Sequence, residues 1–283
     1  MKTGLVLEGG AMRGMFTAGV LDVLMEQGIE VDGVIGVSAG AAFGCNYKSR
    51  QKGRALRYNM RYCDDKRYCG IECLIKTGNL FGAEFCYGEI PEKLDIFDTE
   101  TFKNTPMEFY VVATDVETGE PVYHRCQMGH QEDMDWIRAS ASMPGVSKPV
   151  ELDGKKLLDG GIVDPIPLKF FENLGYDRIV VVLTQPRDFM KPKTKALPAM
   201  KWLLKEQPAV YRAMEVRHHV YNQETAYVRT KENRGEILVI RPEEKLPIHR
   251  VEHDPNRLKA VYQIGKQVAE NRMAQVRSFL AVD

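Results

Sequence analysis

The sequence has no long hydrophobic run. None of its apolar stretches approaches the roughly 18 residues needed to cross a bilayer, so we expect no transmembrane helix. Charge of one sign is not in excess either, because 39 Lys and Arg face 39 Asp and Glu. No overall field therefore attracts nucleic acid, and attraction to an anionic membrane has to come from a local group of basic residues.

Paired cysteines and a leader segment are also missing. The six cysteines all lie in the first half at irregular spacings, and none forms a C-x-x-C pair. We therefore expect reduced thiols and no zinc site. Residues 1–3 run directly into the strand-like residues 4–7, without the apolar segment of a signal peptide. These absences predict a cytoplasmic protein that uses no metal and no cofactor.

A G-x-S-x-G pentapeptide is the main motif that the chain does contain. It runs from Gly36 through Ser38 to Gly40, after a short segment, residues 31–35, that ends in Val34 and Ile35, and before a series of small residues. A strand, a tight turn and a helix in this order form a nucleophile elbow, which holds the serine hydroxyl out from the sheet. The two glycines avoid a clash beside the turn. The alternative is an ordinary glycine-rich turn.

A second glycine turn precedes the pentapeptide. Residues 4–7 form an expected strand, and Gly9, Gly10 and Gly14 lie in the turn that follows it. The order G-G-x-x-x-G is a poor dinucleotide fingerprint, which requires G-x-G-x-x-G. Backbone N–H groups of this turn, at the same sheet edge as the elbow, would instead suit an oxyanion hole.

The alternation of strands and helices predicts an α/β fold with parallel strands and helices on both faces. The β-branched residues 179–184 are typical of a central parallel strand. We expect a catalytic domain over residues 1–184. Residues 185–283 are expected to form a helical extension with one strand, packed on the same core. Its helical residues 200–227 form either core or a lid on lipid, and we favour core.

Two further segments bear on lipid binding. Residues 48–67 carry eight basic residues against two acidic ones, a pattern that fits a solvated helix surface or a site for transient contact with an anionic membrane. Residues 78–98 are rich in glycine and aromatic residues. We expect a long loop there, which either covers an acyl pocket or packs beneath the surface.

A base for Ser38 is not supplied by any histidine motif, since none of the six histidines lies in a pattern that would place it. Only one strand precedes the elbow, which also argues against the α/β-hydrolase fold. The remaining candidate is Asp159, at the end of a hairpin over residues 150–158 and followed by Gly160 and Gly161. A carboxylate is a weaker base than imidazole, so an oxyanion hole would have to lower more of the barrier.

The three motifs together resemble the patatin-like phospholipases, and in particular bacterial cytoplasmic members with an extra C-terminal segment. The glycine turn, the pentapeptide and Asp-Gly-Gly occur in that family in this order. The resemblance implies a three-layer α/β/α fold with a mostly parallel sheet and hydrolysis of acyl-lipid esters by a Ser–Asp dyad. It also implies the following roles: Ser38 as nucleophile, Asp159 as base, Gly9, Gly10 and Ala11 as oxyanion donors, and Arg13, Gly14, Gly36, Gly40, Gly160 and Gly161 as supporting residues.

The sequence departs from the family pattern at two positions. The glycine triplet ends in Ala11, which keeps the N–H but admits fewer backbone angles. Asp164 stands where many members have asparagine, and we interpret it as loop architecture. Two other functions stay open, an acyltransferase that uses the same serine and a nucleotide-binding module built on the glycine turn. An acyl lipid is the expected partner, and nucleic acid is not.

Overall fold

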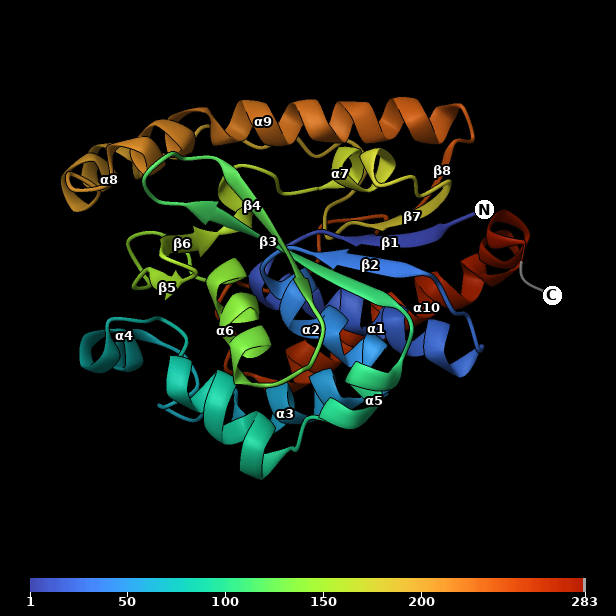
Figure 1. Ribbon diagram of the computed structural model, residues 1–283, viewed down its shortest axis with the longest axis horizontal. Coiled ribbons are helices and arrows are strands. Elements are labelled where there is room, and N and C mark those ends of the chain that lie inside the picture. The colour runs from blue at the N-terminus through green and yellow to red at the C-terminus, as the bar shows by residue number, and fades with distance from the viewer. Residues whose placement is uncertain (282–283) are drawn as a thin grey trace.

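A mixed eight-stranded sheet forms the centre of the molecule (Figure 1). The computed structural model describes residues 1–281. The strand order is β5-β6-β3-β2-β1-β7-β8, and β4 pairs with β3 outside this path. The strands are β1 (Thr3–Leu7), β2 (Gly33–Gly36), β3 (Glu108–Asp115), β4 (Pro121–Cys126), β5 (Val150–Leu152), β6 (Lys155–Asp159), β7 (Arg178–Val182) and β8 (Ile237–Ile240).

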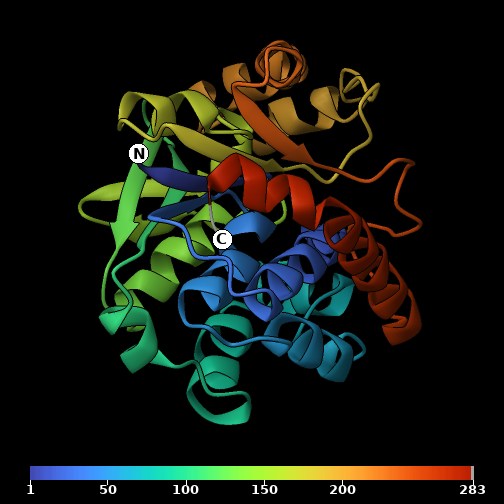
Figure 2. The same ribbon diagram turned by 90° about the vertical axis from the view of Figure 1, so that its right-hand side faces the viewer.

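Helices cover both faces of this sheet, as the two perpendicular views show (Figure 1, Figure 2). The larger helices are α1 (Gly14–Glu26), α2 (Ala39–Lys48), α3 (Arg54–Tyr62), α6 (Gln131–Ser140), α9 (Pro208–Asn233) and α10 (Pro255–Leu280). The shorter ones are η1 (Ala11–Arg13), α4 (Ile71–Thr77), η2 (Phe85–Leu94), α5 (Thr99–Asn104), η3 (Gly160–Ile162), α7 (Leu168–Asn173) and α8 (Leu197–Leu203).

Alternating side chains of the central strands divide the core into two layers. Leu5 and Leu7 of β1 belong to the cluster that contains α1, α2 and α10. Val6, between them, belongs to the cluster on the opposite face, which contains Phe171 of α7 and Tyr221 of α9. This alternation follows from the two-residue period of a strand. The three-layer α/β/α fold with a mostly parallel sheet is confirmed, since β3, β2, β1, β7 and β8 are all parallel.

One edge of β3 is shared by two strands, and this arrangement brings the two predicted catalytic segments together. β2 pairs with β3 as far as Gly36 opposite Val111. β6 pairs with β3 from Ala113, which lies opposite Asp159. Because β4 occupies the other edge of β3 over residues 109–114, β2 and β6 must follow each other along the same edge. The end of β6 therefore meets the turn that leaves β2.

Residues after 184 contribute to the same sheet and the same layers. β8 pairs in parallel with β7 and extends the sheet. Helix α10 packs on α1 at a very close approach, because a Cβ atom at Gly265 would lie 2.1 Å from the carbonyl oxygen of Phe16. A Cβ atom at Gly19 would lie 2.1 Å from the carbonyl oxygen of Tyr262. Two facing glycines therefore let the backbones of the two helices touch.

Several local expectations differ from the structure. Residues 78–98 are not one long loop, since η2 occupies ten of them. The helical residues 200–227 belong to two helices, α8 and α9, with a break before Pro208. Strand β4 was not expected, because its mixed polar and apolar residues are only half-buried and give no clear period. Within residues 1–281, no helix is both long and apolar enough to cross a membrane.

Candidate active site

Ser38 occupies a strained turn between β2 and α2. Its backbone angles are φ 56° and ψ −121°, in a region that L-residues rarely adopt. The turn is tight because a Cβ atom at Gly40 would lie 2.3 Å from the carbonyl oxygen of Leu7. At Gly36 a Cβ atom would lie 2.5 Å from the nitrogen of Ala41. Both glycines of the pentapeptide are therefore required by close backbone approach.

The amide of Ser38 is held by a side chain from α6. Ser38 N–H donates to the hydroxyl of Ser140 at 3.0 Å. Ser140 is the last residue of α6 and is fully buried. No local pattern predicts this contact, because the two serines are 102 positions apart. The contact also occupies the Ser38 amide, so the N–H groups for an oxyanion have to come from elsewhere.

Asp159 lies at the end of β6 and is almost completely buried. Its Oδ1 accepts the N–H of Gly161 at 2.7 Å, while Oδ2 has no hydrogen-bond partner of standard geometry among residues 1–281. Burial raises the pKa of Asp159, and this effect is opposed by hydrogen bonding from the Ser38 side chain, by the cation of Arg217 and by the Gly161 N–H. The Ser38 side chain therefore lies near the Asp159 carboxyl group, which has one oxygen without a hydrogen-bond partner in the described chain.

Backbone contacts fix the Asp159 turn. The N–H of Asp159 donates to the carbonyl of Ser142, and the Thr114 hydroxyl donates to the carbonyl of Asp159. A Cβ atom at Gly160 would lie 2.2 Å from the carbonyl oxygen of Val112. Gly160 thus lets the turn pack against β3, and a Cβ atom at Gly161 would lie 3.0 Å from Asp159 Oδ1.

The glycine turn after β1 lies beside Ser38. A Cβ atom at Gly9 would lie 2.8 Å from the Cβ of Ser38. Within residues 1–281, the amide N–H groups of Gly9, Gly10 and Ala11 donate to no backbone or side-chain acceptor. Ala11 has φ 50°, a left-handed angle that costs an L-residue roughly 1–2 kcal/mol. The alanine thus keeps a backbone conformation that glycine would adopt without strain.

A buried carboxylate fixes the start of this turn. Glu8 accepts hydrogen bonds from the backbone N–H and the hydroxyl of Thr184 and from the hydroxyl of Tyr221. These partners lie at the end of β7 and in α9. Glu8 therefore ties the glycine turn to the segment after residue 184, a role that sequence reasoning did not assign.

Arg217 of α9 reaches the Asp159 turn. Its Nε donates to the carbonyl of Gly161 at 2.6 Å. Burial lowers the pKa of Arg217, and the negative charge of Asp159 acts in the opposite direction. Arg13 is the last residue of η1. Its Nε is also buried and has no hydrogen-bond partner among the described residues. Sequence reasoning predicted a supporting role for Arg13 but missed Arg217, which comes from outside the three motifs.

A cavity of about 860 Å³ opens beside Ser38. Its lining includes Ala11, Arg13 and Ser38 from the site itself, and apolar residues of α2, η2 and α6. Examples are Phe43, Ile90 and Ile137. A volume of this size falls in the range of pockets that hold small-molecule ligands. The segment 78–98 does line this cavity, through Leu80, Phe81 and η2, although it is largely helical.

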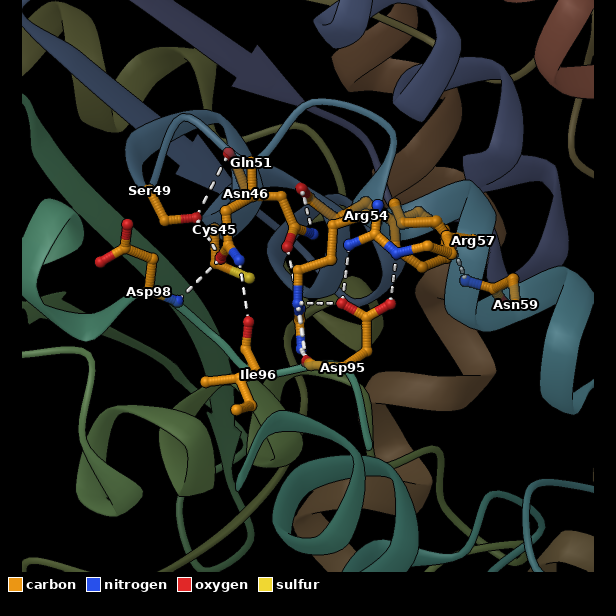
Figure 3. A network of polar contacts seen from close by, with 12 residues as sticks. Cys45, Asn46, Ser49, Gln51, Arg54, Arg57, Asn59, Asp95, Ile96 and Asp98 are labelled. Atoms are coloured by element: carbon orange, nitrogen blue, oxygen red, sulfur yellow. Dashed lines mark hydrogen bonds and ion pairs between the residues drawn. The ribbon is translucent and has the colours of Figure 1, made fainter. Parts of the chain in front are cut away.

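Several basic residues of the segment 48–67 are engaged within the protein, and Figure 3 shows two of them, Arg54 and Arg57. Lys48 is buried and donates to the carbonyl of Met107. The guanidinium of Arg54 is buried against Asn46 and the backbone of Asp95, and Arg57 pairs with the Asp95 carboxylate at 2.6 Å. These contacts leave little of the apparent surplus of positive charge free at the surface.

One group of side chains in the described chain has the residue types of a metal site. The candidate ligand atoms of His124, Cys126 and Asp133 lie within 4.8 Å of one another. Asp133 Oδ2 already accepts three backbone N–H groups, those of residues 127–129. Burial raises the pKa of the Cys126 thiol well above its usual range, which disfavours the thiolate that a metal requires. The group therefore acts first as an anchor for the start of α6.

Comparison with known sequences gives two matches to domain families. The patatin-like phospholipase family matches residues 5–171, and a domain of unknown function matches residues 207–281. The first match contains the glycine turn, the pentapeptide and the Asp159 turn. The second contains α9, β8 and α10.

Individual relatives are similar over about two thirds of the chain. The uncharacterized protein YjjU of Escherichia coli K12 is 35% identical over 199 residues, which are 65% of this chain and 52% of that protein. An uncharacterized NTE family protein of Mycobacterium bovis is 28% identical over 181 residues, 64% of this chain and 48% of that protein. Lysophospholipase nte1 of Aspergillus oryzae is 29% identical over 186 residues, 64% of this chain and 12% of that protein.

The chain thus spans about half the length of two of these relatives and much less of the third. The family match covers more than half of the chain and all three motifs. With the sheet order and the two facing segments described above, it identifies the chain as a member of the patatin-like phospholipase family.

Proposed function

We propose that this protein is a serine hydrolase that cleaves carboxylic esters of acyl lipids with a Ser38–Asp159 dyad. One observation carries the proposal. The buried Oδ2 of Asp159 has no standard hydrogen-bond partner, and it belongs to the carboxyl group whose pKa the Ser38 hydroxyl lowers. A contact that is long in the absence of substrate and closes during reaction is common for catalytic pairs.

In the proposed mechanism Ser38 Oγ attacks the ester carbonyl while Asp159 takes its proton. The oxyanion accepts hydrogen bonds from the N–H groups of Gly9, Gly10 and Ala11, which have no other acceptor in the described chain. Asp159 returns the proton to the leaving alcohol, and an acyl-Ser38 ester remains. Water then attacks this ester with Asp159 as base, which releases the fatty acid and restores the serine.

The cavity supports an acyl substrate. Side chains such as Phe43, Ile90 and Met134 give part of it an apolar lining suited to a hydrocarbon chain. Burial of such a chain is favourable by about 0.8 kcal/mol for each CH₂ group removed from water. Binding energy from the chain, remote from the ester, can then be used to position the carbonyl carbon at Ser38.

A fluorophosphonate probe, which modifies activated serines, tests the nucleophile. We expect the wild-type protein to be labelled and Ser38→Ala to be unlabelled, while Ser142→Ala, a buried serine nearby, keeps the label. Equal labelling of Ser38→Ala would exclude Ser38 as the nucleophile.

Product analysis then distinguishes hydrolysis from acyl transfer to another alcohol. Free fatty acid as the main product supports hydrolysis, whereas transfer to an added alcohol that outruns hydrolysis supports an acyltransferase.

We also propose transient contact with an anionic lipid surface, through the mouth of the cavity and not through residues 48–67. Large apolar side chains are exposed on α4 and α8, which lie at the same end of the molecule (Figure 1). Ile75 is 80% exposed and Trp202 is 74% exposed. Lys193 and Lys195, which precede α8, and Lys201 within it are exposed and have no ion pair among residues 1–281.

Sedimentation with lipid vesicles tests this contact. We expect more protein to bind vesicles that contain phosphatidylserine than neutral vesicles, because exposed lysines are attracted to anionic headgroups. Trp202→Glu should reduce binding to both kinds of vesicle. Trp202→Glu protein that binds as well as the wild type would exclude α8 from the contact.

A further inference from the structure

Four cationic side chains lie together in the cavity beside the proposed dyad. Arg13, Lys191, Arg217 and Arg250 all contribute to its lining. Arg13 follows the glycine turn, whereas the other three come from the chain after residue 184. Lys191 lies in the loop before α8, Arg217 in α9, and Arg250 in the loop before α10. Three separate segments thus converge on one part of the cavity.

The structure positions these cations without pairing them with carboxylates. Arg217 uses Nε for the carbonyl of Gly161, which leaves its two terminal nitrogens free for a ligand. Lys191 Nζ lies 4.3 Å from the centre of the Tyr221 ring. The backbone N–H of Lys191 donates to the Asn222 side chain at 2.8 Å, which fixes the loop on α9. These contacts orient the cations without ion pairs, and only the nearby carboxylates of Asp159 and Glu8 offset part of their charge.

The other two cations also lack partners. Arg13 Nε is buried and makes no hydrogen bond within residues 1–281, and Arg250 has neither an ion pair nor a hydrogen bond there. The nearby carboxylate of Glu8 is already engaged by Thr184 and Tyr221. Arg13, Lys191 and Arg217 are half-buried and Arg250 is exposed, so four positive charges face two nearby carboxylates in a partly enclosed site. A surplus of positive charge in such a place favours the binding of an anion.

Electrostatics agree with this geometry. The pKa of Lys191 is lowered to about 8, first by burial and then by the positive charges of Arg217, Arg13 and Arg250, against the opposing effect of Glu8. Burial also lowers the pKa of Arg13, and Arg250 adds to that effect. The cations therefore repel one another, and a bound anion would relieve this repulsion.

We propose that these four side chains bind the phosphate of the substrate, and that the preferred substrates are acyl esters with a phosphate monoester headgroup. This inference rests on the proposed ester hydrolysis. Guanidinium groups match phosphate oxygens with paired hydrogen bonds, and lysine adds a point charge. A headgroup that also carries an ammonium group would be repelled by the same four cations. A neutral headgroup would leave them unpaired.

The proposal predicts the order of substrates that differ only in headgroup. With one acyl chain held constant, kcat/KM should be highest for lysophosphatidate, lower for lysophosphatidylcholine, and lowest for monoacylglycerol. Lys191→Ala and Arg250→Glu should lower kcat/KM for lysophosphatidate by roughly tenfold or more, as expected for a lost charged contact. The same variants should lower monoacylglycerol cleavage by a clearly smaller factor, because the lost contact with phosphate does not apply to that substrate.

Lys259→Glu is the matched control, since it makes the same charge change as Arg250→Glu at an exposed position of α10. It should leave all three substrates unaffected. Equal losses on all three substrates in the Arg250→Glu variant, or no preference for lysophosphatidate in the wild type, would overturn the proposal.

Calorimetry on the Ser38→Ala variant tests phosphate binding independently of the proposed catalytic role of Ser38. Tight binding of lysophosphatidate that Arg250→Glu weakens, with weak binding of monoacylglycerol, supports the headgroup site even if Ser38 proves not to be the nucleophile. Inorganic phosphate that binds as tightly as lysophosphatidate would instead indicate a site for free phosphate and overturn the headgroup assignment. Absence of Ser38 labelling, by contrast, counts only against the proposed hydrolysis.

Discussion

In the proposed dyad, Asp159 is subject to two opposing demands. A general base must be charged to accept a proton from Ser38, but burial of the carboxyl group raises its pKa and disfavours the charged form. A carboxyl group whose pKa is raised by folding contributes stability at low pH, and that contribution is lost as the pH rises through its folded-state pKa. We therefore expect the proposed base to be charged, and the site to be active, at pH values above the folded-state pKa of Asp159, where its buried charge destabilises the fold.

Asp159→Asn separates these two effects. We expect kcat to fall by roughly 10²–10⁴-fold, the usual contribution of a general base. At neutral pH the variant should unfold at a higher temperature than the wild type, because it no longer buries a charge. This gain should shrink as the pH falls, since the wild-type carboxyl group then becomes protonated. Activity assays and thermal unfolding between about pH 4 and 8 measure both outcomes, and a variant less stable than the wild type at neutral pH would contradict the argument.

Ser38 and Asp159, the residues of the proposed dyad, could be selected from the sequence because their signals are local. Glycines at fixed offsets from Ser38 and Asp159 report turns that only a small residue can form. Ser140, Arg217 and Tyr221 were not predictable, because each acts through a contact more than 50 positions away in the chain and no neighbouring residue signals that role. The partners of a catalytic residue are thus harder to infer from sequence than the residue itself.

At the scale of elements, a pair of carboxyl groups connects α9 to the loop after Asp159. Glu224 of α9 accepts the N–H of Ile166, and Tyr123 of β4 donates to Asp164 at 2.6 Å. The pKa of Glu224 is raised to about 10, mainly by burial and then by the adjacent Asp164. Glu224 is therefore protonated at neutral pH and can donate a hydrogen bond to Asp164. This contact supports the interpretation of Asp164 as loop architecture.

Glu224→Gln should make the stability of the protein less dependent on pH. Glutamine keeps the shape and hydrogen-bonding groups of a protonated glutamate but does not titrate. In the wild type, Glu224 contributes to the free energy of unfolding below pH 4.5. This contribution is lost progressively as the pH rises toward about 10. Urea unfolding should therefore show similar stabilities near pH 5 and an increasing advantage for Glu224→Gln at higher pH.

An exposed glutamate on α10 provides the control for this experiment. Glu270→Gln removes one carboxylate without a buried partner, so its stability relative to the wild type should vary little with pH. If the Glu224→Gln difference is as flat as that of Glu270→Gln, the two carboxyl groups do not share a proton. The anchor between α9 and the dyad loop would then have another physical basis.

At the scale of the whole molecule, the division at residue 184 does not coincide with a gap in the structure. The sequence changes there from the family motifs to a segment without them, and we expected this segment to be an extension packed on the same core. Pairing of β8 with β7 and packing of α10 on α1 bury both segments in one core. Long-range packing of this kind leaves no local pattern in the sequence. We therefore propose that residues 1–281 unfold as one cooperative unit.

Gly265→Ala tests this proposal, since the new Cβ atom would lie 2.1 Å from the Phe16 carbonyl oxygen and force α10 away from α1. We expect a loss of about 1–3 kcal/mol in unfolding free energy, the usual cost of overpacking. Trp136 of α6 is buried and Trp202 is exposed, so a Trp202→Phe background lets fluorescence report on the part of the chain before residue 184. Circular dichroism reports on all helices. If the molecule is one unit, Gly265→Ala shifts both urea midpoints equally, although the substitution lies 129 positions from Trp136.

Gly88→Ala is the control for this substitution, because a Cβ atom there meets nothing within 4 Å and the backbone needs no left-handed angle. Its midpoint should stay close to that of the wild type or rise slightly. A Trp136 transition that stays at the wild-type midpoint in Gly265→Ala, while part of the helical signal is lost earlier, would mean that the two segments unfold separately. In that case the contacts of Arg217 and Glu8 would not be held by one common core. Substitutions in α10 should then leave unchanged the urea concentration at which Ser38 labelling is lost. Cooperative unfolding instead requires that labelling be lost at the same, lowered urea concentration as both spectroscopic signals.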